Sequence, residues 1–262
     1  MHKINNFNLI KLSKITLLVL MLITTPHCAK EEKKTEDLSF DELKQKTLAS
    51  LKEKKYKEAL QPLEVMVAQH AEKDDLSEYK LMLADSYFNT GNLPSAFQMY
   101  EHFKDFYPSD KQAEYAYYQA IKSKFYQTLK IDCDQSDTQE TINLCKDYLR
   151  NPSYSKYKND IEDIEHTCQR KLIDKEVYVY NFYLKKGKLK SAKNRLTYLK
   201  ENYLDKDTNL NPRLLYLEAK LAQKEKDNDT LGKKVEQLME QYPESPFTRM
   251  AQGLSVKNNF MF

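Results

Sequence analysis

Residues 83–108 read LADSYFNTGNLPSAFQMYEHFKDFYP and contain parts of two apolar stripes separated by Gly91-Asn92. The first stripe, which begins upstream, consists of Leu76, Tyr79, Leu83, Ala84 and Tyr87; the second consists of Leu93, Ala96, Phe97, Tyr100, Phe103 and Tyr107. Spacings of three and four residues place each set on one face of a helix. Because neither helix can bury its stripe alone, we expect an antiparallel hairpin that ends at Pro108.

The turn of this hairpin recurs elsewhere in the chain. Residues 54–59, 91–96 and 187–192 read KKYKEA, GNLPSA and GKLKSA. The final alanines of the first two segments lie 37 residues apart, and those of the last two lie 96 apart, which leaves room for a further repeat with an insertion. Two helices in a period of about 34 residues are typical of tetratricopeptide repeats. The sequence therefore predicts an all-α tetratricopeptide-repeat solenoid of about five helical hairpins.

Composition supports helices and argues against common enzyme folds. Only 4 glycines and 8 prolines occur in 262 residues, too few for the turns of a β or doubly wound protein. There is no glycine-rich phosphate loop, no HExxH and no GxSxG, and His70, His102 and His166 stand on expected helices. We therefore expect no enzyme activity and no cofactor, with a glycan-hydrolysing site in the solenoid as the alternative.

The N-terminus has the character of a signal peptide. Three lysines precede an apolar run of about nine residues, which is shorter than the roughly 20 that span a bilayer. Cys28 stands where cleavage is expected, as in bacterial lipoproteins whose cysteine is lipidated, although His27 replaces the usual small residue. An ordinary signal peptide followed by a chance cysteine is the alternative. Residue 29, which follows the cysteine, is alanine and not aspartate, and this favours sorting of the lipoprotein to the outer membrane.

Removal of residues 1–27 leaves 39 basic and 39 acidic side chains, so no overall basic footprint for nucleic acid is expected, although local patches are possible.

Neither Pro nor Gly occurs from Ser153 to Lys186, which predicts one long helix. The expected organisation is a lipoprotein signal peptide at 1–27, a charged tether at 28–38, repeats one and two at 39–110, and repeats three to five at 111–256, with the long helix at about 153–186.

Three cysteines remain after Cys28. In an oxidising compartment we expect one disulfide and one odd thiol. Cys145 and Cys168 lie on consecutive helices and form the favoured pair, while three buried thiols are the alternative. A metal site of Cys145, His166 and Cys168 would lack a fourth ligand and CxxC spacing, so no metal is expected.

Residues 83–108 resemble the second repeat of the BamD family, the lipoprotein subunits of the outer-membrane β-barrel assembly machine. The likeness continues through residues 113–120, 168–172, 178–183, 187 and 192–195, and it covers most of 39–245. It implies a lipid-anchored adaptor on the periplasmic face of the outer membrane. The implied partners are a BamA-like barrel protein with POTRA domains, other lipoproteins of the machine and unfolded outer-membrane barrel proteins.

The resemblance also suggests site residues. Arg195 falls at the family's interfacial arginine, and a guanidinium suits bidentate contact with a partner carboxylate; an ordinary surface arginine is the alternative. For the substrate groove, helix spacing places these residues on the exposed inner face: Asp85, Phe88, Asn89, Tyr117, Ile121 and Lys124. Apolar groups beside a lysine suit an apolar C-terminal residue and its carboxylate. Packing between repeats is the alternative role of these six residues.

A second function fits the same features. A tetratricopeptide lipoprotein that assists type IV pilus secretin assembly, or that coordinates peptidoglycan and the cell envelope, would also combine hairpins with an anchor. The long helix and the repeat after it favour the assembly machine. Co-purification with either a POTRA-containing barrel protein or a secretin would discriminate between the two.

Overall fold

The computed structural model describes residues 34–70, 76–205, 207 and 209–256. Within these ranges the chain forms eleven α-helices and one short 3₁₀ helix, with no strand, which confirms the all-α fold class. The elements are η1 (Thr35–Asp37), α2 (Phe40–Lys52), α3 (Tyr56–Gln69), α4 (Leu76–Asn89), α5 (Leu93–Phe106), α6 (Ala113–Gln127), α7 (Ser136–Arg150), α8 (Lys158–Lys185), α9 (Leu189–Tyr203), α10 (Leu210–Glu225), α11 (Asn228–Gln241) and α12 (Pro246–Val256). No helix in the described ranges has the length and apolar character needed to cross a bilayer.

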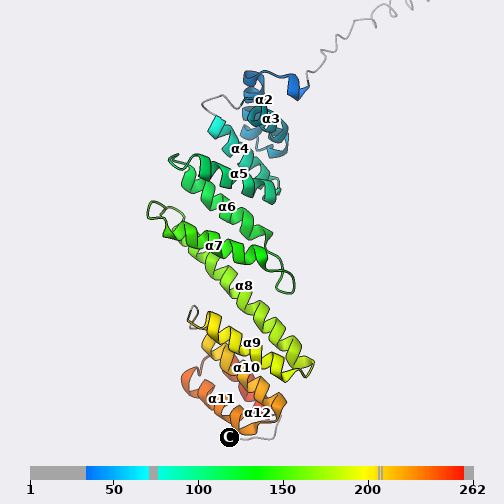
Figure 1. Cartoon of the computed structure of the whole chain (residues 1–262), viewed down its shortest axis with the longest axis vertical. Coiled ribbons are helices and arrows are strands. Elements are labelled where there is room, and N and C mark those ends of the chain that lie inside the picture. The colour runs from blue at the N-terminus through cyan, green and yellow to red at the C-terminus, as the bar shows by residue number, and fades with distance from the viewer. Residues whose placement is uncertain (1–33, 71–75, 206, 208, 257–262) are drawn as a thin grey trace, which may run out of the picture.

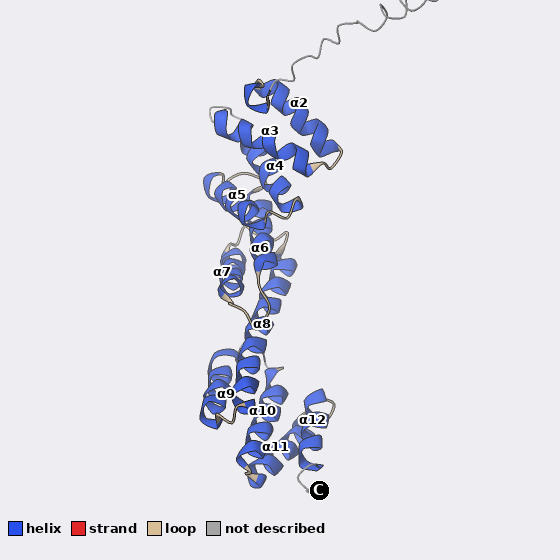
Figure 2. Ribbon diagram, turned by 90° about the vertical axis from the view of Figure 1, so that its right-hand side faces the viewer, coloured by secondary structure: helices blue, strands red, loops and turns tan. Residues whose placement is uncertain are grey.

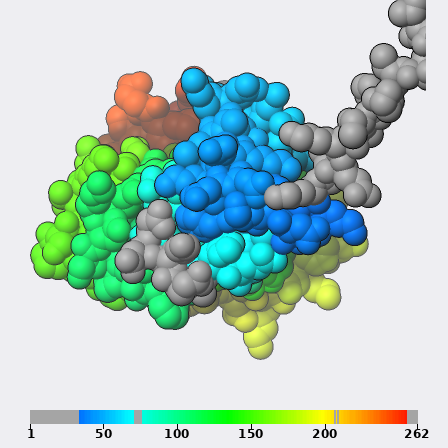
Figure 3. Space-filling view, turned by 90° about the horizontal axis from the view of Figure 1, so that it is seen from above, coloured from blue at the N-terminus to red at the C-terminus, as the bar shows by residue number. Residues whose placement is uncertain are grey.

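The helices pair in sequence order and stack into a rod. The hairpins are α2–α3, α4–α5, α6–α7, α8–α9 and α10–α11, and α12 packs against both helices of the last one. Figures 1 and 2 show these hairpins following one another along the long axis, with α8 running obliquely between the two ends. In the view down that axis, α6–α7 (green) and the C-terminal helices (orange) project on different sides, so the stack twists (Figure 3).

Backbone conformation explains the recurring turn motif. The first residue of each motif has a positive φ: Lys54 at 56°, Gly91 at 81° and Gly187 at 69°. This left-handed residue ends one helix and reverses the chain, and glycine adopts it without steric penalty. The alanine five residues later is fully buried in all three motifs, where its small side chain lets the two helix backbones approach closely.

Helix α8 belongs to two apolar cores. Near its start, Ile161 joins the core built by α4 to α7. Its second half places Ile173, Val177 and Tyr180 in a separate core with α9 and α10. The Tyr180 hydroxyl donates a hydrogen bond to the Leu217 carbonyl at 2.6 Å, which fastens α8 to α10 inside this core. The long helix thus connects the N-terminal and C-terminal groups of hairpins.

The long helix begins at Lys158, several residues later than the sequence predicts. The reason is a tertiary contact, because Glu114 on α6 holds the preceding turn. Its Oε1 atom accepts hydrogen bonds from the Tyr148 hydroxyl at 2.6 Å and from the backbone N–H groups of Ser155 at 2.7 Å and Lys156 at 2.6 Å. These contacts hold residues 155 and 156 in the turn that precedes α8 and satisfy N–H groups that have no acceptor within the helix.

The expected tether is also shorter than predicted. Its last residues fold as η1, where the Thr35 hydroxyl donates a hydrogen bond to Gln61 Oε1 at 3.2 Å. Leu38, which follows η1, packs against the apolar core formed by α2, α3 and α4. These contacts outweigh the polar composition of the segment. The predicted signal peptide at 1–27 and Cys28 lie outside the described residues.

Candidate functional site

Helix α6 has aromatic side chains on all its faces, and its alanines mark the buried one. Ala113, Ala116 and Ala120 are at most 2% exposed. Tyr117 and Ile121 lie on the same face and are 6% and 0% exposed. The prediction that Tyr117 and Ile121 line an exposed groove is therefore wrong, because both fill the core between α5, α6 and α7.

Lys124 also faces a neighbouring helix rather than a groove. Its side chain is 12% exposed, and its ammonium lies 3.1 Å from Glu140 and 3.5 Å from Asp137, both on α7. The same ammonium lies 4.4 Å from the ring centroid of Phe97. Lys124 therefore ties α6 to α7, which corrects the prediction that it faces a ligand carboxylate.

Asp85 lies beneath the surface of the second hairpin. Its Oδ1 atom accepts hydrogen bonds from the hydroxyls of Tyr100 at 2.5 Å and Tyr115 at 2.8 Å. Burial raises the pKa of Asp85 above its usual value, and the two hydrogen bonds oppose that shift only in part. Asn89 is exposed as predicted, and its amide donates to the Asp85 carbonyl at 2.7 Å. Asp85 thus orders two tyrosines between α4, α5 and α6.

Phe88 belongs to a partly exposed surface that we call the aromatic face, formed by Phe88, Tyr118, Lys122, Tyr126 and Tyr157. The Lys122 ammonium lies 5.4 Å from the Phe88 ring centroid and 5.1 Å from that of Tyr118. Tyr118 stacks on Tyr157 with centroids 4.2 Å apart, and Phe88 meets Tyr126 at 6.0 Å. The face therefore presents π-surfaces around one cation, which suits an apolar side chain next to a carboxylate.

A cleft opens in the middle of the rod, between α7, α8 and α9. Leu172, Tyr198 and Tyr203 supply its apolar side, residues 132–136 form the opposite wall, and its volume is about 700 Å³. The wall belongs to the connection between α6 and α7, which is held to α8 where the Lys175 ammonium donates to the Cys133 carbonyl at 3.2 Å. The cleft is open enough to receive a protein segment.

Arg195 lies beside this cleft. Its Nη1 atom is 3.1 Å from Glu176 Oε2, and its guanidinium carbon is 6.0 Å from the Tyr198 ring centroid. The arginine side chain is 39% exposed, whereas Glu176 is 16% exposed. Arg195 is therefore held in place by its own chain while part of its guanidinium stays open to a partner.

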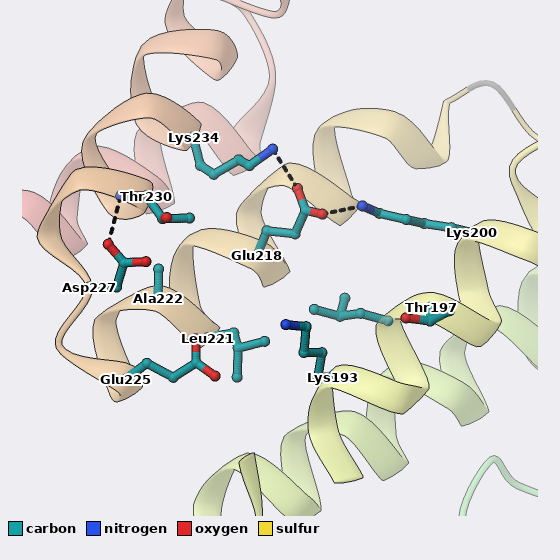
Figure 4. Close-up of a pocket in the computed structure, with 11 residues that line it drawn as sticks. Lys193, Thr197, Lys200, Glu218, Leu221, Ala222, Glu225, Asp227, Thr230 and Lys234 are labelled. Atoms are coloured by element: carbon teal, nitrogen blue, oxygen red, sulfur yellow. Dashed lines mark hydrogen bonds and ion pairs between the residues drawn. The ribbon is translucent and has the colours of Figure 1, made fainter. Parts of the chain in front are cut away.

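A second hollow, of about 250 Å³, lies between α9, α10 and α11 (Figure 4). Glu218 on α10 pairs with two ammonium groups, those of Lys200 on α9 and of Lys234 on α11 at 3.0 Å. These ion pairs join three helices. Figure 4 shows Lys193 and Glu225 on the other side of the hollow, away from this cluster. The ion pairs stabilise the C-terminal group of hairpins. Leu221 and Ala222 form part of the apolar lining of the hollow.

The three cysteines among the described residues, Cys133, Cys145 and Cys168, are free thiols. Cys145 and Cys168 are fully buried, and burial raises the pKa of both. Cys133 is exposed, so the alternative of three buried thiols is wrong, and the favoured bridge between Cys145 and Cys168 is not formed. His166 is exposed, whereas the thiols of Cys145 and Cys168 are buried. The described residues contain no group of three or more side chains that could hold a metal ion.

Comparison with known proteins adds a family relationship. The family model described as YfiO, outer membrane lipoprotein, matches residues 36–231. A protein named outer membrane protein assembly factor BamD, from Rickettsia prowazekii (strain Madrid E), is 26% identical over 195 residues. The alignment covers 74% of this chain and 78% of that protein, so the similarity extends across both groups of hairpins.

Proposed function

Because this chain belongs to the YfiO family of outer membrane lipoproteins, we propose that it acts as an outer-membrane protein assembly factor. In this proposal the chain is anchored through a lipidated Cys28 to the periplasmic face of the outer membrane. It receives unfolded barrel proteins on its N-terminal hairpins and presents them to a BamA-like barrel protein bound by its C-terminal hairpins. It works by binding and has no catalytic step.

The observation that carries this proposal is the aromatic face. A segment of unfolded barrel protein that ends in an apolar residue offers a side chain for the rings of Phe88, Tyr118 and Tyr126. Its carboxylate would meet Lys122, which takes the part that the sequence assigned to Lys124. Each aromatic contact of this kind is worth about 1 kcal/mol, so two or three suffice for weak and reversible capture. Weak capture suits an adaptor that must release its substrate.

We assign the BamA-like partner to the cleft edge at Arg195. A carboxylate of the partner can share the exposed part of the guanidinium, while Glu176 keeps the other side of the group fixed. This arrangement limits the side-chain entropy lost on binding. The open cleft beside it, with Tyr198 and Tyr203, offers apolar surface for the rest of the contact.

The substrate proposal is tested by titrating a fluorescent peptide from the C-terminus of an outer-membrane barrel protein. The test variant is Tyr118→Ala with Lys122→Ala, and the matched control is Phe106→Ala with Lys111→Ala, since both control residues are exposed outside the aromatic face. We expect roughly tenfold weaker binding for the test variant, because loss of a central contact costs more than about 1 kcal/mol. Equal affinities of the two variants would reject the aromatic face as the substrate site.

The partner proposal is tested by co-purification from membranes. We expect a POTRA-containing barrel protein to accompany the chain and to be lost when Arg195→Ala is introduced, but retained with Arg249→Ala, whose side chain is exposed on α12. Retention of the barrel protein by the Arg195 variant would reject the assigned contact. Recovery of a secretin instead would reject the proposed function itself.

A further inference from the structure

One stretch of this chain departs sharply from its overall charge balance. Between Glu176 and Glu201 there are seven cationic side chains and no acidic one. The stretch covers the end of α8, the turn at Gly187 and most of α9. The whole sequence carries only a small net charge of +3, so this region is a local basic patch within a nearly balanced protein.

Two of the seven cations have structural partners. Arg195 pairs with Glu176, and Lys200 pairs with Glu218 (Figure 4). The other five are Lys185, Lys186, Lys188, Lys190 and Lys193, and all five are exposed. Within the described part of the chain, the side-chain ammonium group of none of these five lysines has a hydrogen-bond or ion-pair partner. Lys185, Lys186, Lys188 and Lys190 surround the turn between α8 and α9, and Lys193 lies one turn further along α9, where it also lines the hollow of Figure 4. Their charges act on whatever approaches this end of the fourth hairpin.

The position of these lysines does not serve the helices themselves. Lys188 is the N-cap of α9 and Lys190 lies in its first turn, where no acidic residue occurs. The helix dipole favours negative side chains at this end, so cations there reduce the stability of α9. Stability alone would favour serine or aspartate at these places.

Exposed aromatic side chains adjoin the lysines on α8. Tyr178 is 47% exposed and Phe182 is 49% exposed. Their spacing of four residues continues into Lys185 and Lys186, so all four lie along one stripe of the helix. Aromatic rings followed by lysines are typical of side chains at the boundary between a membrane and water.

We propose that this surface, which we call the basic tip and define as Tyr178, Phe182 and the five unpaired lysines, binds anionic phospholipid headgroups. All five free cations are lysines, which are depleted in protein–protein interfaces, whereas the ammonium on a flexible stem suits a fluid array of phosphates. The chain belongs to a family of outer membrane lipoproteins, so such a surface is at hand.

The consequence concerns orientation. The basic tip lies at the turn between α8 and α9, well along the rod from its N-terminal hairpin (Figure 1). A protein held both at its N-terminus and at the basic tip would lie along the membrane instead of projecting from it. Binding of lipid headgroups at the basic tip does not depend on lipidation of Cys28 or on the proposed partners, whereas this orientation follows only when the N-terminus is anchored as well.

The test uses the chain without the expected signal peptide (residues 1–27) and with Cys28→Ser, so that neither an apolar leader nor an acyl group contributes to binding. Sedimentation with vesicles of phosphatidylethanolamine and phosphatidylglycerol is compared with sedimentation with phosphatidylcholine vesicles. The test variant carries Lys186→Gln, Lys190→Gln and Lys193→Gln; the matched control carries the same change at three exposed lysines of the N-terminal half, Lys52, Lys57 and Lys111.

We expect the unmodified surface and the control to bind anionic vesicles alone, with affinity that falls as salt is raised. The test variant should bind at least about tenfold more weakly, since each lysine near an anionic surface contributes on the order of 1 kcal/mol. Equal binding by test and control variants, or equal binding to both kinds of vesicle, would overturn the proposal. So would a test variant that keeps vesicle binding but loses a protein partner, because the basic tip would then be a protein-docking surface.

Discussion

Glu114 offers a sharp test of how the two groups of hairpins are joined. One carboxylate oxygen of this α6 residue accepts hydrogen bonds from Tyr148 and from two backbone N–H groups, those of Ser155 and Lys156. These contacts fix the turn from which α8 starts. Replacing Glu114 with alanine removes all three acceptor contacts, and replacing it with glutamine keeps an oxygen but removes the charge.

The magnitude follows from the number of bonds and from their exposure. A hydrogen bond to a charged group contributes about 1.5 to 3 kcal/mol when buried, and less where water can replace the lost partner. Since Glu114 is only partly buried, we take roughly 0.7 kcal/mol for each bond. Glu114→Ala should therefore lower the local stability by about 2 kcal/mol, and Glu114→Gln by about 1 kcal/mol.

Hydrogen exchange at the amides of Ser155 and Lys156 is the direct assay. A loss of about 2 kcal/mol corresponds to roughly 30-fold faster exchange of these amides in the alanine variant. The matched control is Glu78→Ala, because Glu78 also lies in the first turn of its helix and shares the dipole contribution. Unchanged exchange in the Glu114 variant, or an equal effect of the control, would refute the role assigned to this carboxylate.

The pH dependence gives a second readout. Burial alone would raise the pKa of Glu114, but the hydrogen bonds from Tyr148 and the two backbone groups outweigh it, so the pKa lies below the usual 4.5. The ionised form therefore adds stability that is present above pH 4.5 and is lost as the pH falls through the lowered value. The difference between the wild type and Glu114→Gln should be largest at neutral pH and should close in acid.

Three further predictions concern the cores. Cys133 should be alkylated rapidly in the native protein, while Cys145 and Cys168 should react only after unfolding; mass spectrometry that finds one modified thiol after unfolding without reductant would instead show a bridge between the buried pair. Asp85→Asn should raise the melting temperature at neutral pH, because burial raises the pKa of Asp85 and the folded state loses stability as this carboxyl ionises. The gain in melting temperature should vanish in acid, where Asp85 is protonated. An equal gain at every pH would contradict this explanation. Tyr180→Phe should cost about 1 kcal/mol in denaturant titrations through loss of its buried hydrogen bond to α10, and an unchanged midpoint would exclude that contribution.

The architecture could be predicted because three of the five hairpins carry the same local signals. The residues at 54, 91 and 187 reverse the chain, and the alanine five positions on is buried each time. These are local features, set by backbone conformation and side-chain size. A reader of the sequence can therefore place the hairpins without knowing how they stack.

The candidate site was predicted less well because aromatic residues alone do not orient a helix. Tyr115, Tyr117 and Tyr118 point in different directions on α6, and hydrophobicity does not tell them apart. The sequence did contain a usable signal, since Ala116 and Ala120 mark the side where helices approach most closely. Following the alanines would have assigned Tyr117 to the core and left Tyr118 on the surface.

The later start of α8 could not have been predicted in the same way. The residues after Ser153 include no helix breaker, and their own preferences allow an earlier start. The turn before the helix is held by a carboxylate from α6, about forty positions away in sequence, through the bonds of Glu114 to Ser155 and Lys156. Contacts of this kind are decided by the assembled solenoid.

Because α8 is shared between two cores, it fixes how one half of the rod is rotated relative to the other. Ile161 engages one half of the rod and Ile173 the other, and the helix runs unbroken between them. Adding a single residue to that span would turn one half against the other by about 100° and push them about 1.5 Å apart. The number of residues between Ile161 and Ile173 therefore sets the rotation about the α8 axis that separates the aromatic face from the cleft at Arg195.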